Sequence, residues 1–175
     1  MSNKKFTDVK TISYRISQIR ERAIRGALKG MRKSANEIAQ TARDFAPVDE
    51  KRLVEAIRVR STGGGRDQLG RFARKEVQVY IEGRLRRSDG TTVARYAAIM
   101  HELLAPYGAG FYKLGKKSQA KAAAGYDVGG KFLERALEEH RRGVLSQAAI
   151  EVRKEIRRKS RREIMDELGD EGDEL

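Results

Sequence analysis

The sequence predicts an α+β fold in which two long helices flank a small β region. Apolar residues recur every three or four positions from Thr11 to Phe45 and from Lys131 to Leu168, which is typical of amphipathic helices. Between them, Lys75 to Glu82 alternates apolar and polar side chains, which is typical of a strand. The chain has 175 residues, so we expect a single domain over residues 1–168.

The first predicted helix contains two glycines. Gly26 and Gly30 each cost about 1 kcal/mol relative to alanine inside a helix. Either the helix bends there or another backbone comes close. Pro47 ends the helix, because the residue before a proline is pushed out of the helical region.

Short elements and turns follow this helix. Residues Leu53 to Ser61 alternate apolar and charged side chains and predict a short strand, whereas four glycines mark Thr62 to Arg71 as a flexible connection. The pair Asp89 and Gly90 predicts a hairpin turn, with Thr91 to Ala94 as its return strand.

Residues 95–168 predict two helices separated by a long loop. Residues Arg95 to Leu104 predict a helix that Pro106 ends. Residues 105–130 lack periodicity and predict a flexible loop. The second long helix carries a basic extension over residues 153–168, and residues 169–175 predict a disordered acidic tail.

The composition restricts the function classes. The chain has 38 Lys and Arg against 25 Asp and Glu, a net charge of +13, which attracts nucleic acid, an anionic membrane or an acidic protein. Without cysteine, a disulfide scaffold, a thiolate metal site and a cysteine nucleophile are excluded. No apolar run approaches the roughly 20 residues that span a bilayer, and the start of the chain lacks the apolar core of a signal peptide. We therefore expect a soluble protein made in the cytoplasm, with no membrane partner.

Few residues are suited to catalysis. His101 and His140 are the two histidines, and no serine or carboxylate is clearly placed to complete a triad with either. His101 and Glu102 point about 100° apart as helix neighbours, which makes them poor joint metal ligands. Residues 110–118 differ from a phosphate-binding loop at Lys117, where that motif needs Ser or Thr. We expect no enzyme activity and no catalytic, metal-binding or cofactor-binding residues.

Two basic clusters are candidates for contacts with a partner or with DNA. We name the first the turn cluster and the second the helix cluster; their members are Arg84, Arg86 and Arg87, and Arg153, Lys154, Arg157, Arg158, Arg161 and Arg162. Neither is interleaved with aromatic residues for base stacking, so specific base readout is not expected. Three roles for these clusters stay open: non-specific contact with a nucleic-acid backbone, docking on an acidic protein, and simple exposure to solvent.

Three segments carry a pattern of short motifs. The end of the first helix and the turn after it, Ala42 to Leu53, is similar to Ala-Pro-Val-Asp-Thr-Gly-x-Leu, with Glu50 and Lys51 in place of Thr and Gly. Tyr96 to Glu102 is similar to Tyr-Ala-x-x-Val-Glu-x-Gly, and Gly130 to Leu137 is similar to Phe-Leu-x-x-Ala. In this order, the segments resemble the tail-completion, or neck, protein family of long-tailed bacteriophages. The matching residues are Ala46, Pro47, Val48, Asp49, Leu53, Tyr96, Ala97, Glu102, Phe132, Leu133 and Ala136.

The resemblance implies both a fold and a role. The fold is a small twisted antiparallel sheet packed on the long N-terminal helix, with a second long helix at the C-terminal end. The role is that of a structural virion protein at the head-tail junction, assembled in the host bacterial cytoplasm. It implies a ring, which we expect to be a hexamer, that completes the upper end of the tail and lets DNA pass. Its partners would be other copies, connector or stopper proteins, and tail terminator or tube proteins.

A second reading belongs to a different functional class. It is a non-specific nucleic-acid-binding protein that uses the turn cluster and the helix cluster. The motif residues have physical roles under either reading, since Pro47 ends a helix, Asp49 can cap the turn that follows, and Leu53 returns an apolar side chain to the core. Whether they determine the fold alone or also bind a partner stays open at this stage.

Overall fold

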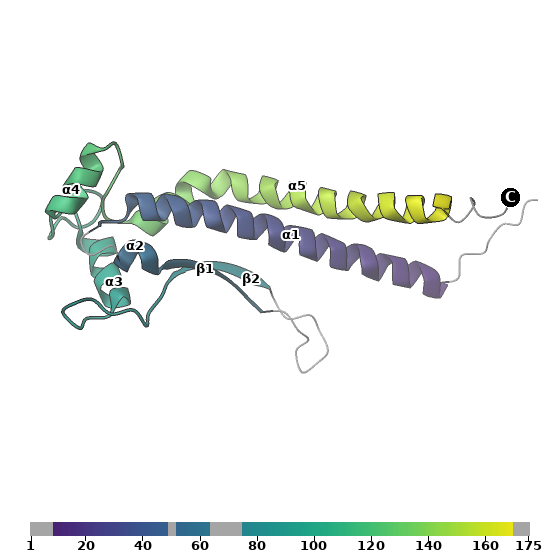
Figure 1. The fold of residues 1–175 in the computed structure, drawn as a ribbon, viewed down its shortest axis with the longest axis horizontal. Coiled ribbons are helices and arrows are strands. Elements are labelled where there is room, and N and C mark those ends of the chain that lie inside the picture. The colour runs from purple at the N-terminus through teal and green to yellow at the C-terminus, as the bar shows by residue number, and fades with distance from the viewer. Residues whose placement is uncertain (1–8, 49–51, 64–74, 170–175) are drawn as a thin grey trace, which may run out of the picture. The chain divides into compact units, whose positions relative to one another are not determined.

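The computed structural model describes the backbone of residues 9–48, 52–63 and 75–169, and the side chains of residues 13–48, 52–63 and 75–158. The elements are α1 (Val9–Phe45), α2 (Arg52–Ala56), β1 (Ile57–Thr62), β2 (Glu76–Ile81), α3 (Val93–Leu103), α4 (Lys116–Ala123) and α5 (Phe132–Gly169) (Figure 1). Over its described residues, no helix combines the length and apolarity that a membrane span requires. The α+β class is confirmed, and both long helices begin and end close to the predicted residues.

The chain divides into two compact units. One consists of Met1–Met31 and Leu145–Leu175, and we name it the helical unit. The other consists of Arg32–Val144, and we name it the central unit. The single domain over residues 1–168 stays a prediction.

In the helical unit, α1 and α5 pack closely along each other, as Figure 1 shows. A Cβ atom at Gly26 would lie 2.6 Å from the Cα of Val152, and one at Gly30 would lie 2.5 Å from the Cα of Ala148. Such short separations leave no room for a side chain, so close backbone approach explains both glycines. Glu151 is buried at this contact, and its carboxylate lies 3.4 Å from Lys29 Nζ.

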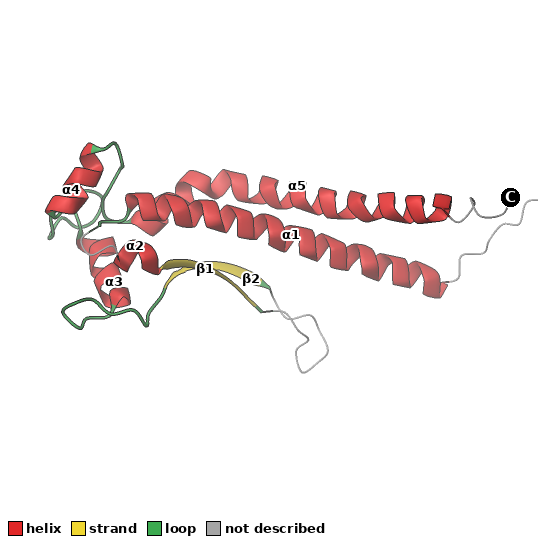
Figure 2. Ribbon diagram, in the orientation of Figure 1, coloured by secondary structure: helices red, strands yellow, loops and turns green. Residues whose placement is uncertain are grey.

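In the central unit, the sheet packs on the last turns of α1. Strands β1 and β2 pair antiparallel, with Ile57 opposite Ile81 and Val59 opposite Val79 (Figure 2). The core contains Ile57 and residues of α1, and Val59, Val79 and Ile81 pack against it. On the other face, Arg60 lies 4.5 Å from the ring centre of Tyr80. The strand predicted over Lys75 to Glu82 is confirmed, as is the small antiparallel sheet on the long helix.

Three local predictions differ from the structure. Residues 52–56 form α2 and not the start of a strand; the strand begins at Ile57. The predicted return strand, Thr91 to Ala94, is reduced to one bridge between Arg86 and Thr92. Thr92 instead caps α3, because its side-chain oxygen accepts a hydrogen bond from the Arg95 N–H at 3.4 Å. Residues 105–130, predicted as a loop, contain α4. In the predicted acidic tail, residues 170–175 lie outside the described residues.

Candidate functional site

The three motif segments meet in the central unit. The N–H of Gly129 donates to the carbonyl oxygen of Phe45 at 3.0 Å, and the N–H of Lys131 donates to that of His101 at 2.7 Å. These two bonds join the ends of α1 and α3 to the start of α5. We name this region the motif junction, formed by residues 45–48, 96–102 and 130–137.

Most of the motif residues form the interior of this junction. Ala46, Ala97, Phe132 and Ala136 are completely buried, and Leu53 is nearly so. Pro47 is also buried, whereas Val48, Tyr96 and Leu133 are half-buried. Asp49 lies outside the described residues. The apolar motif residues thus build the core, which supports the reading that they determine the fold.

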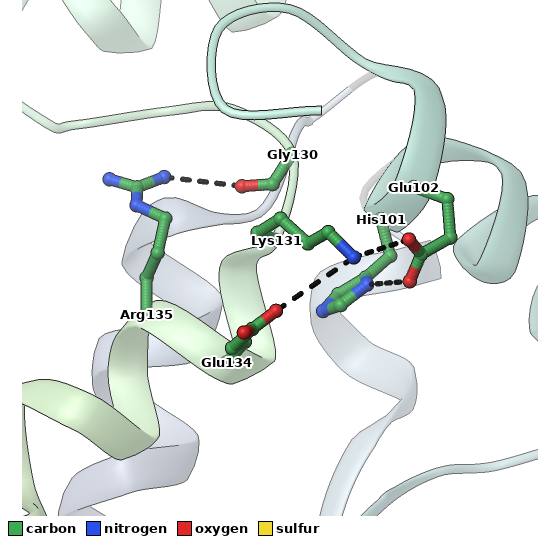
Figure 3. Close-up of polar contacts among 6 residues, drawn as sticks. All are labelled: His101, Glu102, Gly130, Lys131, Glu134 and Arg135. Carbon is green, nitrogen blue, oxygen red and sulfur yellow. Dashed lines mark hydrogen bonds and ion pairs between the residues drawn. The ribbon is translucent and has the colours of Figure 1, made fainter. Parts of the chain in front are cut away.

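Among the described motif residues, Glu102 is the exposed charged one, and it is the centre of a charged group (Figure 3). Its carboxylate lies 2.8 Å from Nδ1 of His101 and forms an ion pair with Lys131, whose Nζ is also 3.8 Å from Glu134. The hydrogen bond from Lys131, followed by that with His101, holds the pKa of Glu102 below its ordinary value. The same bond to Glu102 raises the pKa of Lys131. The His101 ring stands edge-on to Phe132, with ring centres 5.0 Å apart.

Arg135 occupies a cage of aromatic and carbonyl groups beside this charged group. Its guanidinium lies 4.3 Å from the ring centre of Phe45 and 3.7 Å from that of Tyr107. It donates to the carbonyl oxygen of Asp127 at 3.0 Å and forms an ion pair with the Asp127 carboxylate. The hydroxyl of Tyr107 donates to the same carboxylate at 2.7 Å, which raises the pKa of Tyr107. Arg135 therefore connects the first motif to the 105–130 segment.

An open depression lies beside the Arg135 cage. It measures about 510 Å³ and is lined by Tyr107, Lys131, Glu134, Arg135 and Glu138. Tyr107 and Lys131 adopt φ angles of +78° and +54°, a region that side chains other than glycine seldom occupy. Such backbone strain persists only where the surrounding structure enforces it. The depression therefore has a fixed rim of charged and aromatic groups.

The 105–130 segment contributes contacts that sequence reasoning missed. The Val48 N–H donates to Ser118 Oγ at 2.9 Å, and Lys121 Nζ donates to the carbonyl oxygens of Arg43 and Ala46 at 2.6 and 3.0 Å. Burial lowers the pKa of Lys121. Helix α4 thereby holds the end of α1, although its composition gave no periodic signal.

The turn cluster has mainly local roles. Arg87 lies 4.0 Å from the ring centre of Tyr96 and 3.4 Å from the Asp89 carboxylate. Arg86 donates to the Gly90 carbonyl oxygen at 3.0 Å, whereas Arg84 is exposed. Two of the three arginines thus stabilise the turn itself.

The helix cluster is largely open to solvent. Arg153, Arg157 and Arg158 are exposed, and Lys154 lies 3.1 Å from the Glu151 carboxylate. The side chains of Arg161 and Arg162 lie outside those described. The two clusters belong to different units, the turn cluster to the central unit and the helix cluster to the helical unit.

The interactions at the motif junction are packing contacts, hydrogen bonds and ion pairs that hold the three motif segments together. Among the described residues, no three side chains of the metal-binding types gather closely enough to hold a metal ion. His140, the second histidine, lies with Nε2 2.8 Å from the hydroxyl of Thr41 on α1. No protein-family model, curated protein or solved structure matches the chain.

Proposed function

We propose that this protein is a structural component of the neck of a long-tailed phage. In this role it is a ring-forming tail-completion protein that joins the upper end of the tail to the head connector and lets DNA pass. The observation that carries the proposal is the convergence of the three motif segments. They are separated by tens of residues in the sequence, yet two backbone hydrogen bonds and the Arg135 contact with Phe45 join them.

Large apolar side chains on the surface support an assembly role. Phe111 and Leu145 are 79% and 80% exposed, and Tyr14 is 64% exposed. Single exposed apolar residues are common, but groups of them mark surfaces that a neighbour covers. Tyr107, Tyr112 and Tyr126 are exposed in the same segment as Phe111. Such surfaces suit a protein that acts by binding other copies and other virion proteins.

The proposal is tested by locating the protein in intact virions. We expect a label attached to the full chain to appear between head and tail, in a number of copies that matches a closed ring. The mass of the purified chain in solution gives an independent measure of ring formation. A label found elsewhere in the virion, or virions that lack the protein, would overturn the proposal.

A further inference from the structure

Each helix of the helical unit carries a row of apolar residues, and Tyr14 and Ile150 are exposed outside these rows. The row residues recur at intervals of three or four, on α1 as Ile16, Ile19, Ala23 and Ala27, and on α5 as Leu145, Ala149, Val152 and Ile156. Ile16, Ile19 and Leu145 remain 61%, 48% and 80% exposed. The packing of α1 on α5 therefore leaves much of this apolar surface in water.

The two rows of apolar residues lie on the same side of the helix pair. The helices run antiparallel, because Gly26 is level with Val152 and Gly30 with Ala148. At 100° per residue, the mean direction of each row is displaced by roughly 50° from that of the contact positions, in the same rotational sense, and Val152 belongs to both the row and the contact. In an antiparallel pair, equal rotations bring both rows to one side. The eight residues thus form one surface, which we name the apolar stripe.

The α5 half of the apolar stripe is bordered by positive charge. Arg153 follows Val152 and Arg157 follows Ile156, and both arginines are exposed. The nearby carboxylates of Glu151 and Glu155 each lie 3.4 Å from Lys29 Nζ and are thus paired. An apolar surface with a basic border fits an amphipathic segment whose polar residues are acidic.

The chain itself contains such a segment. Residues 163–175, which we name the acidic segment, hold seven Asp and Glu and no Lys or Arg, together with Ile164, Met165 and Leu168. The other 18 acidic residues of the chain stand against 38 basic ones, a net charge of +20. If two apolar stripes met, Arg153 and Arg157 of one copy would face those of the other and repel them, whereas the acidic segment complements these arginines.

The geometry of α5 favours a contact between copies. The acidic segment begins seven residues after Ile156, and α5 continues to Gly169. At 1.5 Å per residue, the segment starts about 10 Å farther along the same helix. Because residues 163–169 belong to the same helix as the stripe, they cannot fold back on its earlier turns, and they can reach the α5 half of the stripe in a second copy.

We propose that the acidic segment of one copy docks on the apolar stripe of the next. Its carboxylates would face Arg153 and Arg157, and its apolar side chains would cover the stripe. The contact joins two different surfaces, so it repeats from copy to copy and closes into a ring where the rotation allows. This inference rests on the proposed function in one respect, because it assigns the contact between neighbours in that ring.

Crosslinking between copies tests the contact, because the chain has no cysteine of its own. Full-length Ala149→Cys and Leu168→Cys variants, one of them isotopically labelled, are mixed and treated with a short thiol crosslinker. We expect a product that contains one chain of each variant. The control is Ile150→Cys, on the adjacent residue outside the stripe, which should give little product with Leu168→Cys. No mixed product, or equal yields from Ala149→Cys and Ile150→Cys, would overturn the inference.

Charge reversal gives a second test in solution. The Arg153→Glu, Arg157→Glu double variant should not form the crosslink when it carries Ala149→Cys. Partner chains with Asp166→Lys and Glu167→Lys should restore it. Failure of the restored pair would reject the charge-complementary contact.

The inference and the proposed function can fail separately. If the crosslink forms in solution but virions lack the protein, the docking contact is supported and the neck assignment is rejected. If the label appears in the neck but Ala149→Cys and Ile150→Cys crosslink equally well, the neck assignment is supported and only the docking contact is rejected.

Discussion

At the scale of single residues, the two glycines of α1 have a clear steric role. Gly30→Ala improves helix propensity, but its Cβ would lie 2.5 Å from the backbone of Ala148. Because backbone cannot move aside cheaply, we expect the free energy of unfolding to fall by about 1–3 kcal/mol. Chemical denaturation followed by helical circular dichroism measures this change.

The matched control for this substitution is on α5. Gly143 is exposed, and a Cβ there would meet no atom within 4 Å. Gly143→Ala should therefore raise the free energy of unfolding by about 1 kcal/mol. If Gly30→Ala were as favourable as Gly143→Ala, the close contact between α1 and α5 would be wrong.

Glu102 gives a prediction about pH. Its pKa is lowered in the folded protein from an ordinary value of 4.5, so its ionised form stabilises the fold. This contribution is complete above pH 4.5 and is lost as the pH falls through the lower, folded pKa. We expect Glu102→Gln to be less stable than the wild type at neutral pH and equally stable at the acid end.

Unfolding curves at several pH values measure this difference. Glu138→Gln is the control, because Glu138 pairs with Arg141 on an exposed surface, where both side chains are at least 70% exposed. Such surface pairs contribute little, so this variant should follow the wild type at every pH. A Glu102→Gln curve parallel to the wild type would contradict the role given to Lys131 and His101.

At the scale of elements, α4 is expected to depend on two side chains. Ser118 and Lys121 make the hydrogen bonds that join α4 to the end of α1. The double variant Ser118→Ala, Lys121→Met removes these bonds. Amide hydrogen exchange in residues 116–124 should become faster, while that of α5 stays unchanged. Lys113→Met, at an exposed position outside α4, is the control and should leave the exchange rates of α4 unchanged.

The sequence predicted the long elements better than the short ones. α1 carries many turns of periodic apolar residues and β2 alternates over its full length, so local pattern sufficed for both. α5 was also found from its apolar repeat, although basic residues fill its later turns and weaken the repeat there. α2 was assigned to a strand because five residues are too few to show a helical period. Thr92 could be read as a strand residue or a helix cap, and its hydrogen bond to Arg95 decides between them.

The motif junction was predictable only in part. The apolar motif residues were identified from their resemblance, and most are buried. Ser118, Lys121, Tyr107 and Asp127 were missed, because their partners lie far away in the sequence. Gly129 and Gly130 were the available signal: adjacent glycines before a helix fit a close approach of backbone, and a Cβ at Gly130 would lie 2.5 Å from the Leu104 carbonyl oxygen.

At the scale of the whole molecule, the charge distribution separates the two functional readings. If the acidic segment covers Arg153 and Arg157, the wild-type chain should bind double-stranded DNA weakly. Replacing the seven carboxylates of the acidic segment with amides should raise both the affinity and its dependence on salt. Titration of labelled DNA at several salt concentrations measures both quantities.

The nucleic-acid reading predicts another outcome in the same titration. The wild type would already bind with a steep salt dependence, at about 0.9 per phosphate contact, and the carboxylate replacements would change it little. Lys113→Gln is the control, because Lys113 is exposed and belongs to neither basic cluster, so this variant should leave the slope unchanged. A steep and unchanged slope would favour DNA binding over the neck assignment.

The close packing of α1 on α5 at Gly26 and Val152 also affects the order in which parts of the chain can fold during translation. Residues 32–144 leave the ribosome before the part of helix α5 that packs on Gly26 and Gly30 has been synthesised, so the central unit can fold first. The arginine-bordered apolar side is completed only when the α5 turns around Val152 emerge. Under the docking proposal, a nascent chain therefore cannot bind a neighbouring copy through this surface before the α5 turns around Val152 have been synthesised.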